Sequence, residues 1–361
     1  MNKHQISKAD FEKYKRQIVL DEVGTEGQLL LANSKVLVIG AGGLSSPILQ
    51  VLAGAGVGTI GVIDFDKVSL SNIHRQLLYT TEEVGIAKTE VASKRLKQIN
   101  PDSTILPYEF RIDESNALKL IEKYDLVVDG SDSFATRYLV NDACVILNKP
   151  LVFGAVYKFI GQVSVFNFED GPTYRCAFPE IPEQTEIPDC STIGVLGSLT
   201  GIIGNFMANE ALKIILKNEH VLSGKLMHID TLTYAFDLID IEKDDKNSKI
   251  TELGAYGDVS CEMPEVKYLT ANELDHLLQS EEEVLIYNLK YATQDDDLDY
   301  AQSVNTEDLL LGKLPMPDDR KIVIICDYGI QSESIAEYLQ KTYQKENIYS
   351  LKDGLLAYKA K

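Results

Sequence analysis

Acidic and thiol side chains stand in loops that follow short apolar runs rich in β-branched residues. Asp64 follows the run TIGVI, Asp132 comes shortly after DLVV, and Cys326 follows KIVII. Runs of this kind predict buried parallel strands, and open α/β folds bind ligands at the carboxyl ends of such strands. The chain therefore predicts two loop-built sites, one suited to a nucleotide and one built on a thiol.

The stretch 36–66 predicts the nucleotide site. Its first apolar run leads into GAGGLSS, whose glycines leave no Cβ between the backbone and an incoming phosphate. These glycines are Gly40, Gly42 and Gly43. Ser45 or Ser46 is expected to cap the next helix, whose free N–H groups and positive dipole end favour an anion. A second strand then delivers Asp64, which can accept hydrogen bonds from ribose hydroxyls.

Two other interpretations of this loop remain open. A nicotinamide-dinucleotide fingerprint requires a third glycine where this chain has Ser45, so an oxidoreductase rests on the glycine-rich loop alone. A tight turn that needs glycine only for packing is the second alternative. The residues that follow favour the nucleotide.

Polar residues that suit phosphate and metal binding follow at later strand ends. Asn72 and Arg75 lie in the loop SLSNIHRQ, and Lys88 begins a helix that ends near Asn100. An arginine offers a planar fork for phosphate oxygens. Asp132 beside a triphosphate would need a cation such as Mg²⁺, although its position equally fits the N-cap of the next helix.

Composition and charge restrict the function classes. A chain of 361 residues with 45% hydrophobic and 25% charged residues is typical of a globular protein with two domains. The net charge of −20 argues against nonspecific binding to nucleic acid or anionic membranes, and no apolar run has membrane-spanning length. Five widely spaced cysteines favour a reducing cytoplasm.

The pattern predicts an α/β fold in both domains, with residues 1–245 as the first domain and 266–361 as the second. Residues 246–265 are polar, lack periodicity and predict a linker. The run 225–241 is expected to be the closing strand of the first domain. Residues 5–33 predict amphipathic helix, and Arg16 within it belongs, from spacing alone, to a solvated helix face.

Two cysteines are candidates for chemistry. Cys190 precedes a predicted helix rich in small residues, where a thiol has a lowered pKa, although a buried, inert cysteine fits as well. Cys326 precedes the tight loop DYGIQS, whose N–H groups can stabilise a thiolate or persulfide. Cys144 is expected in the core.

These motifs occur in the order found in the MoeB/ThiF/ubiquitin-activating superfamily, which the chain resembles over roughly residues 10 to 242. The matching segments are GAGGLSS, DFDKVSLSNIHRQ, the helix start at Lys88, DGSDS, GQVSVF and DCSTIGVLG. CDYGIQS, with LKDGLLAYK, resembles the active-site loop of a rhodanese domain. The resemblance implies a Rossmann-like adenylation domain joined to a smaller α/β rhodanese-like domain.

The resemblance also implies a reaction. With ATP and Mg²⁺, the C-terminal glycine of a small ubiquitin-like sulfur carrier is adenylated, and sulfur transfer then gives a thiocarboxylate. Asp64 would hold the ribose and Asp132 the Mg²⁺, while Arg16 would reach into the active site of a partner subunit, which implies a homodimer. Cys326 would carry a persulfide, and Cys190 would resolve the acyl disulfide or form a thioester. The implied phosphate contacts are Ser71, Asn72, Arg75 and Lys88.

Several positions depart from the resembled pattern. The structural zinc site of the superfamily uses two Cys-x-x-Cys pairs. Here the first reads Thr173–Cys176 and the second retains only Cys261, so no zinc is predicted. The usual Asp-Asn reads Asp132–Ser133. The arginine that usually precedes the serine of the rhodanese loop is Gln331, which should raise the pKa of the thiol and weaken thiosulfate binding.

These departures leave alternatives. The rhodanese-like domain is either an active sulfurtransferase, supplied by a persulfide donor such as a cysteine desulfurase, or a docking module for the carrier without chemistry of its own. A scaffold that binds ATP without catalysis is disfavoured, because the cationic and acidic residues of the nucleotide site are retained.

Overall fold

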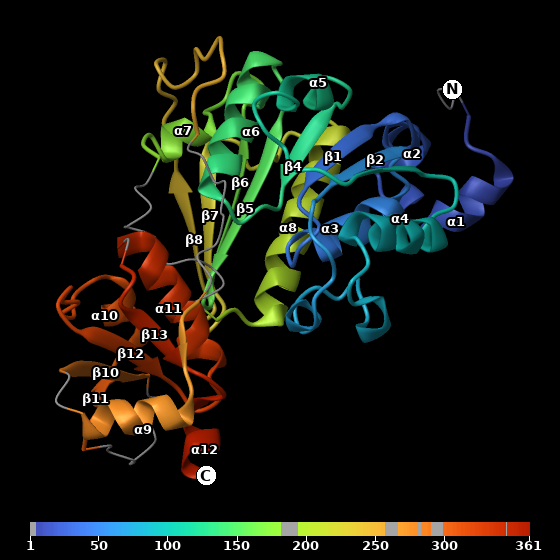
Figure 1. Ribbon diagram of the computed structural model, residues 1–361. Helices are drawn as coiled ribbons and strands as arrows, with labels where there is room; N and C mark the ends of the chain where they lie inside the picture. Colours follow the sequence, from blue (N-terminus) through green and yellow to red (C-terminus); the bar gives the residue numbers. More distant parts are fainter. Residues whose placement is uncertain (1–4, 182–193, 257–265, 281–282, 290–298, 344) are drawn as a thin grey trace. The chain divides into compact units, whose positions relative to one another are not determined.

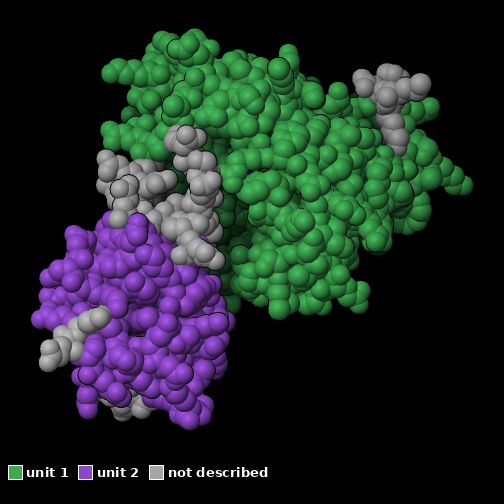
Figure 2. Space-filling view, viewed as in Figure 1, with its two compact units in different colours: residues 1–181, 195–258 green, residues 182–194, 259–361 purple. Residues whose placement is uncertain are grey.

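The computed structural model describes residues 5–181, 194–256, 266–280, 283–289, 299–343 and 345–361. The described residues form two compact units, one built from 5–181 and 195–256 and the other from 266 onward (Figure 2). Each unit has its own sheet and its own hydrophobic core. No helix among these residues combines the length and apolar character that crossing a membrane requires.

The first unit is built on an eight-stranded sheet in the order β3-β2-β1-β4-β5-β6-β7-β8. The first five strands of this order run parallel: β3 (Thr104–Tyr108), β2 (Thr59–Ile63), β1 (Lys35–Ile39), β4 (Leu126–Asp129) and β5 (Leu151–Tyr157). The antiparallel remainder is β6 (Ile160–Phe166), β7 (Lys225–Asp230) and β8 (Ala235–Asp240). Runs of β-branched residues explain why β1, β2 and β4 are buried on both faces.

Helices cover both faces of this sheet (Figure 1). One core joins the sheet to α3 (Ser45–Ala55), α4 (Lys88–Ile99) and α8 (Gly197–Ile215). The other core joins it to α5 (Ala117–Ile121), α6 (Phe134–Ile146) and α7 (Tyr174–Ala177). Two N-terminal helices, α1 (Lys8–Ile18) and α2 (Gly24–Asn33), and two short 3-10 turns, η1 (Leu70–Asn72) and η2 (Thr81–Glu83), complete the unit.

Three expectations about these elements need correction. The run 225–241 is a hairpin of β7 and β8, because residues 231–234 form a turn in which Tyr234 has a positive φ of 60°. Residues 5–33 form two helices interrupted by a turn. Tyr256 is buried in the core of the first unit, so the packed chain extends beyond residue 246, where the linker was expected to begin.

The second unit has a fully parallel sheet in the order β11-β10-β12-β13-β9. Its strands are β9 (Tyr268–Leu269), β10 (Val284–Leu289), β11 (Gln302–Val304), β12 (Lys321–Ile325) and β13 (Ile348–Leu351). One face packs on α10 (Thr306–Leu310) and α11 (Ile330–Tyr343), and the other on α9 (Ala271–Gln279) and α12 (Gly354–Lys359). The chain therefore contains two α/β units, as expected.

Candidate functional site

The candidate nucleotide site lies where the strand order of the first sheet reverses. From the central β1, the chain first adds β2 and β3 on one side and then adds β4 and β5 on the other. The carboxyl ends of β1 and β4 therefore flank this switch point, and open α/β sheets usually bind ligands in the crevice at such a point. The glycine-rich loop follows β1 at this edge (Figure 1).

The three predicted glycines serve different purposes. Gly40 has a φ of +81°, a conformation that residues with a side chain rarely adopt. A Cβ on Gly43 would lie 3.0 Å from Cγ2 of Thr200, so this glycine lets α8 approach the loop. A Cβ on Gly42 would meet nothing closer than Nε2 of Gln76, at 3.7 Å. Gly42 is therefore the one of the three where a Cβ would meet only an ordinary van der Waals contact, without a positive φ being required.

The expected serine cap of α3 is wrong. Leu44 is the N-cap residue and makes no side-chain cap, and the Ser46 hydroxyl donates instead to the Gly42 carbonyl at 3.0 Å. Ser45, which replaces the third glycine of the fingerprint, is fully buried. It fits because its hydroxyl lies against Gly130, where an added Cβ would be 2.3 Å from Oγ.

Asp64 directly follows β2, and two backbone N–H groups hold its carboxylate. The N–H of Ala41 donates to Oδ2 and that of Asp66 donates to Oδ1, both at 2.7 Å. Burial raises the pKa of Asp64, and the charge of Lys88 opposes this shift. Lys88 is only 5% exposed, and its Nζ donates to Oδ2 of Asp66 at 2.8 Å. Two predicted site residues thus meet at one strand end.

The other predicted phosphate contacts share one short turn. Asn72 accepts the N–H of Ser69 through Oδ1 at 3.2 Å, so its carboxamide caps η1. Arg75 donates from Nη1 to the Ser71 carbonyl at 2.8 Å and lies 2.8 Å from Nε2 of His74. These contacts hold the guanidinium against the turn that follows β2.

Two further residues of this edge did not enter the sequence-based site. The Tyr79 hydroxyl donates to the Ala41 carbonyl at 2.7 Å, on the same residue whose N–H holds Asp64. Gln76 is buried, and its Oε1 has no hydrogen-bond partner among the described residues. The signal was present, since Gln76 is the last residue of the polar loop SNIHRQ and Tyr79 follows that loop three positions later.

Asp132 lies in the loop between β4 and α6. It is exposed and makes no hydrogen bond or ion pair with any described residue, so its carboxylate is available. The alternative role as a helix cap is wrong, because Ser133 is the N-cap of α6 and accepts the N–H of Thr136 at 3.4 Å. An exposed, unpaired carboxylate at the crevice fits the donor chemistry of Mg²⁺.

Two buried residues, Asp129 and Arg137, support this loop. Asp129 is 1% exposed, burial raises its pKa, and its Oδ1 accepts the N–H of Ser131 at 2.9 Å. Arg137 donates from Nη2 to the Ser131 carbonyl at 3.2 Å and lies over the rings of Phe134 and Phe153. Both side chains therefore hydrogen-bond to the backbone of Ser131, the residue before Asp132.

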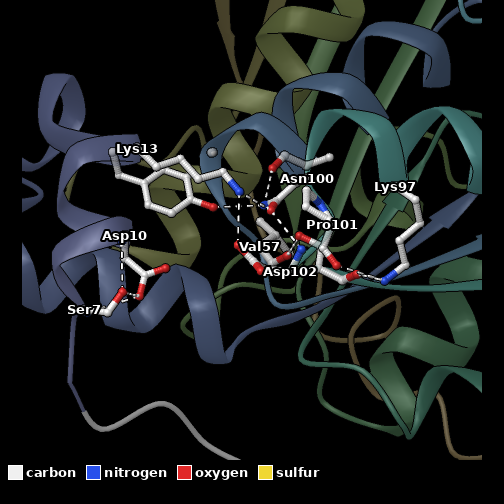
Figure 3. A network of polar contacts seen from close by, with 12 residues as sticks. Ser7, Asp10, Lys13, Val57, Lys97, Asn100, Pro101 and Asp102 are labelled. Carbon is white, nitrogen blue, oxygen red and sulfur yellow. Dashed lines mark hydrogen bonds and ion pairs between the residues drawn. The ribbon is translucent and has the colours of Figure 1, made fainter.

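Arg16 is presented on a helix that is firmly anchored to the first unit. Figure 3 shows Lys13, one turn earlier on α1, reaching Oδ1 of Asn100 at 2.5 Å and Oδ2 of Asp102 at 3.2 Å. Asn100 in turn donates to the Tyr14 hydroxyl and to the backbone, both at 2.9 Å. Arg16 itself is exposed and contacts no described residue through a hydrogen bond or ion pair.

The cysteines of the first unit differ in environment. Cys144 is completely buried in the core, as expected, and burial raises its pKa. Cys190 lies outside the described residues. The helix α8 begins at Gly197 with Leu196 as its N-cap, later than expected, and the lowered pKa of Cys190 stays a prediction.

Cys176 occupies the position where the superfamily pattern places a zinc ligand. Its Sγ accepts the N–H groups of Thr173 and Asp244, both at 3.3 Å, and lies 3.8 Å from the Ser248 hydroxyl. Burial raises its pKa, but these hydrogen bonds and that of the Thr173 hydroxyl outweigh burial and lower it. In the described part of the chain, no three His, Cys, Asp or Glu residues gather as a metal site. Cys261 lies outside that part.

Cys326 follows β12 at the strand reversal of the second sheet, between β10 and β12. It is 5% exposed, and Sγ accepts the N–H of Ser332 at 3.3 Å. The carbonyl of Cys326 accepts the N–H of Leu355 at 2.8 Å, so the start of α12 braces the loop. The backbones of Gly329 and Gly354 lie against each other. A Cβ added to Gly354 would be 2.2 Å from the backbone N of Gly329.

The fold and the edge residues define a Rossmann-like α/β domain with a second, separate α/β sheet. The ThiF family matches residues 14–250 of the chain. The chain therefore belongs to the ThiF family, which confirms the resemblance inferred from its motifs.

Individual relatives extend the match to both units. The chain is 48% identical over 242 residues (66% of this chain and 89% of the other) to "Sulfur carrier protein adenylyltransferase" of Thermus thermophilus. It is 36% identical over 369 residues (98% and 94%) to "Probable adenylyltransferase/sulfurtransferase MoeZ" of Mycobacterium tuberculosis. Among solved structures, Escherichia coli MccB with ATP gives a TM-score of 0.59 at 21% identity, covering 68% of this chain and 75% of that one. This last likeness concerns the fold.

Proposed function

We propose that this protein uses ATP to adenylate the C-terminal glycine of a ubiquitin-like sulfur-carrier protein and then converts the acyl adenylate into a thiocarboxylate. The proposal is supported most directly by Lys88, a nearly buried cation that is paired with Asp66 and acts electrostatically on Asp64 at the strand end beside the glycine-rich loop. Relatives along the full chain carry names that combine adenylyltransferase and sulfurtransferase.

In the first step, a carboxylate oxygen of the carrier attacks the α-phosphorus of ATP, and pyrophosphate leaves. Asp64 would accept the ribose hydroxyls, and Lys88 and Arg75 would stabilise the negative charge that develops on phosphate oxygens. Asp132 would hold Mg²⁺, which neutralises phosphate charge. Arg16, exposed on its anchored helix, would complete the site of a second subunit in a homodimer.

In the second step, a persulfide on Cys326 attacks the acyl carbon through its terminal sulfur, and AMP leaves. The product is an acyl disulfide. A second thiol, which we assign to Cys190, then attacks the Cys326 sulfur and releases the thiocarboxylate, leaving a protein disulfide for a cellular thiol to reduce. Because the loop around Cys326 contains Asp327 and Gln331 rather than cations, a protein persulfide suits it as donor better than thiosulfate.

The exposed edge of the first sheet suits a docking surface for the carrier. Every residue of β8 is exposed, and Tyr234, Phe236 and Leu238 form an apolar strip beside an edge that no other described strand covers. Such a strip accommodates the apolar face of a small protein. Phe236→Asp should raise the KM for the carrier with little change in ATP affinity, and an unchanged carrier KM would contradict this placement.

Intact-mass analysis of the carrier tests the proposed function. A carrier ending in Gly-Gly is incubated with the enzyme, Mg-ATP and a persulfide donor, and it should gain about 16 Da as OH is replaced by SH. Cys326→Ala should abolish this gain and leave carrier-dependent ATP–pyrophosphate exchange intact. A gain that survives in Cys326→Ala would instead favour the docking-module alternative, to which the nearly buried position of Cys326 lends support. Exchange without the carrier would contradict the adenylation step.

A further inference from the structure

The Cys326 thiol is linked to a chain of buried hydroxyl groups. Sγ of Cys326 lies 3.3 Å from the hydroxyl oxygen of Ser332, and the Ser350 hydroxyl donates to that same oxygen at 2.9 Å. Ser332 donates its own proton to the Gly329 carbonyl at 3.0 Å. Both serines are 0% exposed, so no solvent molecule substitutes for these contacts.

The two serines come from different elements that the fold brings together. Ser332 lies in the first turn of α11, and Ser350 lies on β13, which pairs in parallel with β12 just before Cys326 (Figure 1). Ser350 aligns with Ile324, two residues before the cysteine. The apolar core around Ser350 does not need a hydroxyl group on this strand. The hydrogen bond to Ser332 therefore accounts for the serine at this position.

The charges around the Cys326 thiol determine what the linked hydroxyl groups must do. The described charged residues on the loop and on the elements packed against it are Asp327, Glu333, Glu337, Asp353, Lys321, Lys352 and Lys359. Charges of both signs are present there, but among the described residues the hydrogen-bond partner of Sγ is the neutral Ser332 and no charged side chain. A thiolate or persulfide anion at Cys326 must therefore be stabilised by neutral hydrogen-bond donors.

We propose that Ser350 is a positioning residue that makes Ser332 a hydrogen-bond donor to the Cys326 anion. An oxygen that already accepts a hydrogen bond from Ser350 is a poorer acceptor for the S–H group and a stronger donor through its own O–H. When the thiol loses its proton, the Ser332 hydroxyl turns from the Gly329 carbonyl toward Sγ, while Ser350 continues to donate to it. Both effects favour the anionic sulfur.

The test is the pH dependence of Cys326 alkylation by iodoacetamide in the full-length protein, followed by mass spectrometry of the peptide that contains it. Ser350→Ala should lower the alkylation rate near neutral pH about threefold and move the pH midpoint upward, because a hydrogen bond that favours the anion has been weakened. Ser332→Ala should have a larger effect, about tenfold. Ser350→Thr, which keeps the hydroxyl, should restore the wild-type midpoint.

Matched measurements separate this role from a structural one. Ser334→Ala removes a hydroxyl on the same helix that bonds only to the Ile330 carbonyl, and it should leave the midpoint unchanged. A wild-type midpoint in Ser350→Ala, or equal shifts in Ser350→Ala and Ser350→Thr, would overturn the proposal. The inference rests on the proposed role of Cys326, but alkylation requires no carrier or ATP. Loss of thiocarboxylate in Cys326→Ala therefore tests the function separately.

Discussion

The two candidate sites occupy equivalent places in their sheets and differ in how they can hold an anion. Both follow a buried parallel strand at a strand-order reversal. In the first unit, the nearly buried ammonium of Lys88 and the guanidinium of Arg75 border the glycine-rich edge. In the second unit, the hydrogen bonds of the Cys326 sulfur to described residues are those with the N–H and the hydroxyl of Ser332.

The difference follows from the charge that each site must stabilise. A triphosphate and a leaving pyrophosphate carry several charges, which neutral donors alone do not balance. A sulfur nucleophile carries one charge, and its intrinsic reactivity falls as its pKa falls, so strong cation pairing would weaken the attack. Cations therefore suit the phosphate chemistry of the first unit, and neutral donors suit the sulfur chemistry of the second.

Replacing Lys88 should give the largest effect. Lys88→Met removes the buried cation, and we expect carrier-dependent ATP–pyrophosphate exchange to fall by about 10²–10³-fold. Lys94→Met, an exposed lysine on the same helix, is the matched control and should retain wild-type exchange. If the two variants behave alike, the first site does not depend on a buried cation and the comparison fails.

Replacing Asp132 should alter the metal requirement. Even residues that only support a metal ligand contribute about 10–100-fold to metal affinity, so Asp132→Asn should raise the Mg²⁺ concentration for half-maximal exchange by at least about tenfold. Glu122→Gln, which removes another exposed carboxylate of the first unit, should leave that titration unchanged. An unaltered Mg²⁺ titration in Asp132→Asn would show that this carboxylate is not a ligand.

The raised pKa of Asp64 predicts a pH effect on ATP binding. Because burial raises this pKa, the carboxylate takes up its proton at a higher pH than an ordinary aspartate does, and the protonated form accepts ribose hydroxyls less well. ATP affinity should therefore weaken severalfold as the pH falls toward the raised pKa, in equilibrium titrations from pH 7.5 to 5. Asp64→Asn should bind ATP more weakly at pH 7.5 and lose this pH dependence. A dependence that persists in Asp64→Asn would assign it to another group.

Cys176 tests, with a smaller effect, whether neutral donors alone activate a thiol in this protein. Its pKa is lowered by hydrogen bonds from Thr173, Asp244 and Ser248 in spite of burial, whereas burial raises the pKa of Cys144. Peptide-resolved alkylation at pH 7 should modify Cys176 severalfold faster than an unstructured cysteine and leave Cys144 unmodified. Slow alkylation of Cys176 would weaken the rule drawn from Cys326.

Much of the fold followed from the sequence, and several candidate site residues lie at the strand ends where the sequence placed them. Apolar runs ending in Gly40, Asp64 and Cys326 predicted the strands, and the polar residues after them marked the correct edges. The errors concern local boundaries, as at Ser133 and at the start of α8. Propensity and periodicity define the interior of an element well, but several neighbouring residues can cap it almost equally.

Local sequence thus determined which strands form and which residues follow them, because burial patterns and turn residues act over a few positions. Only the tertiary structure decided that Gly43 packs on α8, and that Lys88 reaches Asp66. It alone placed Ser350 behind Ser332, 18 residues away. Such contacts depend on strand register and helix packing, which bring distant segments together. No single stretch of sequence specifies which segments will meet.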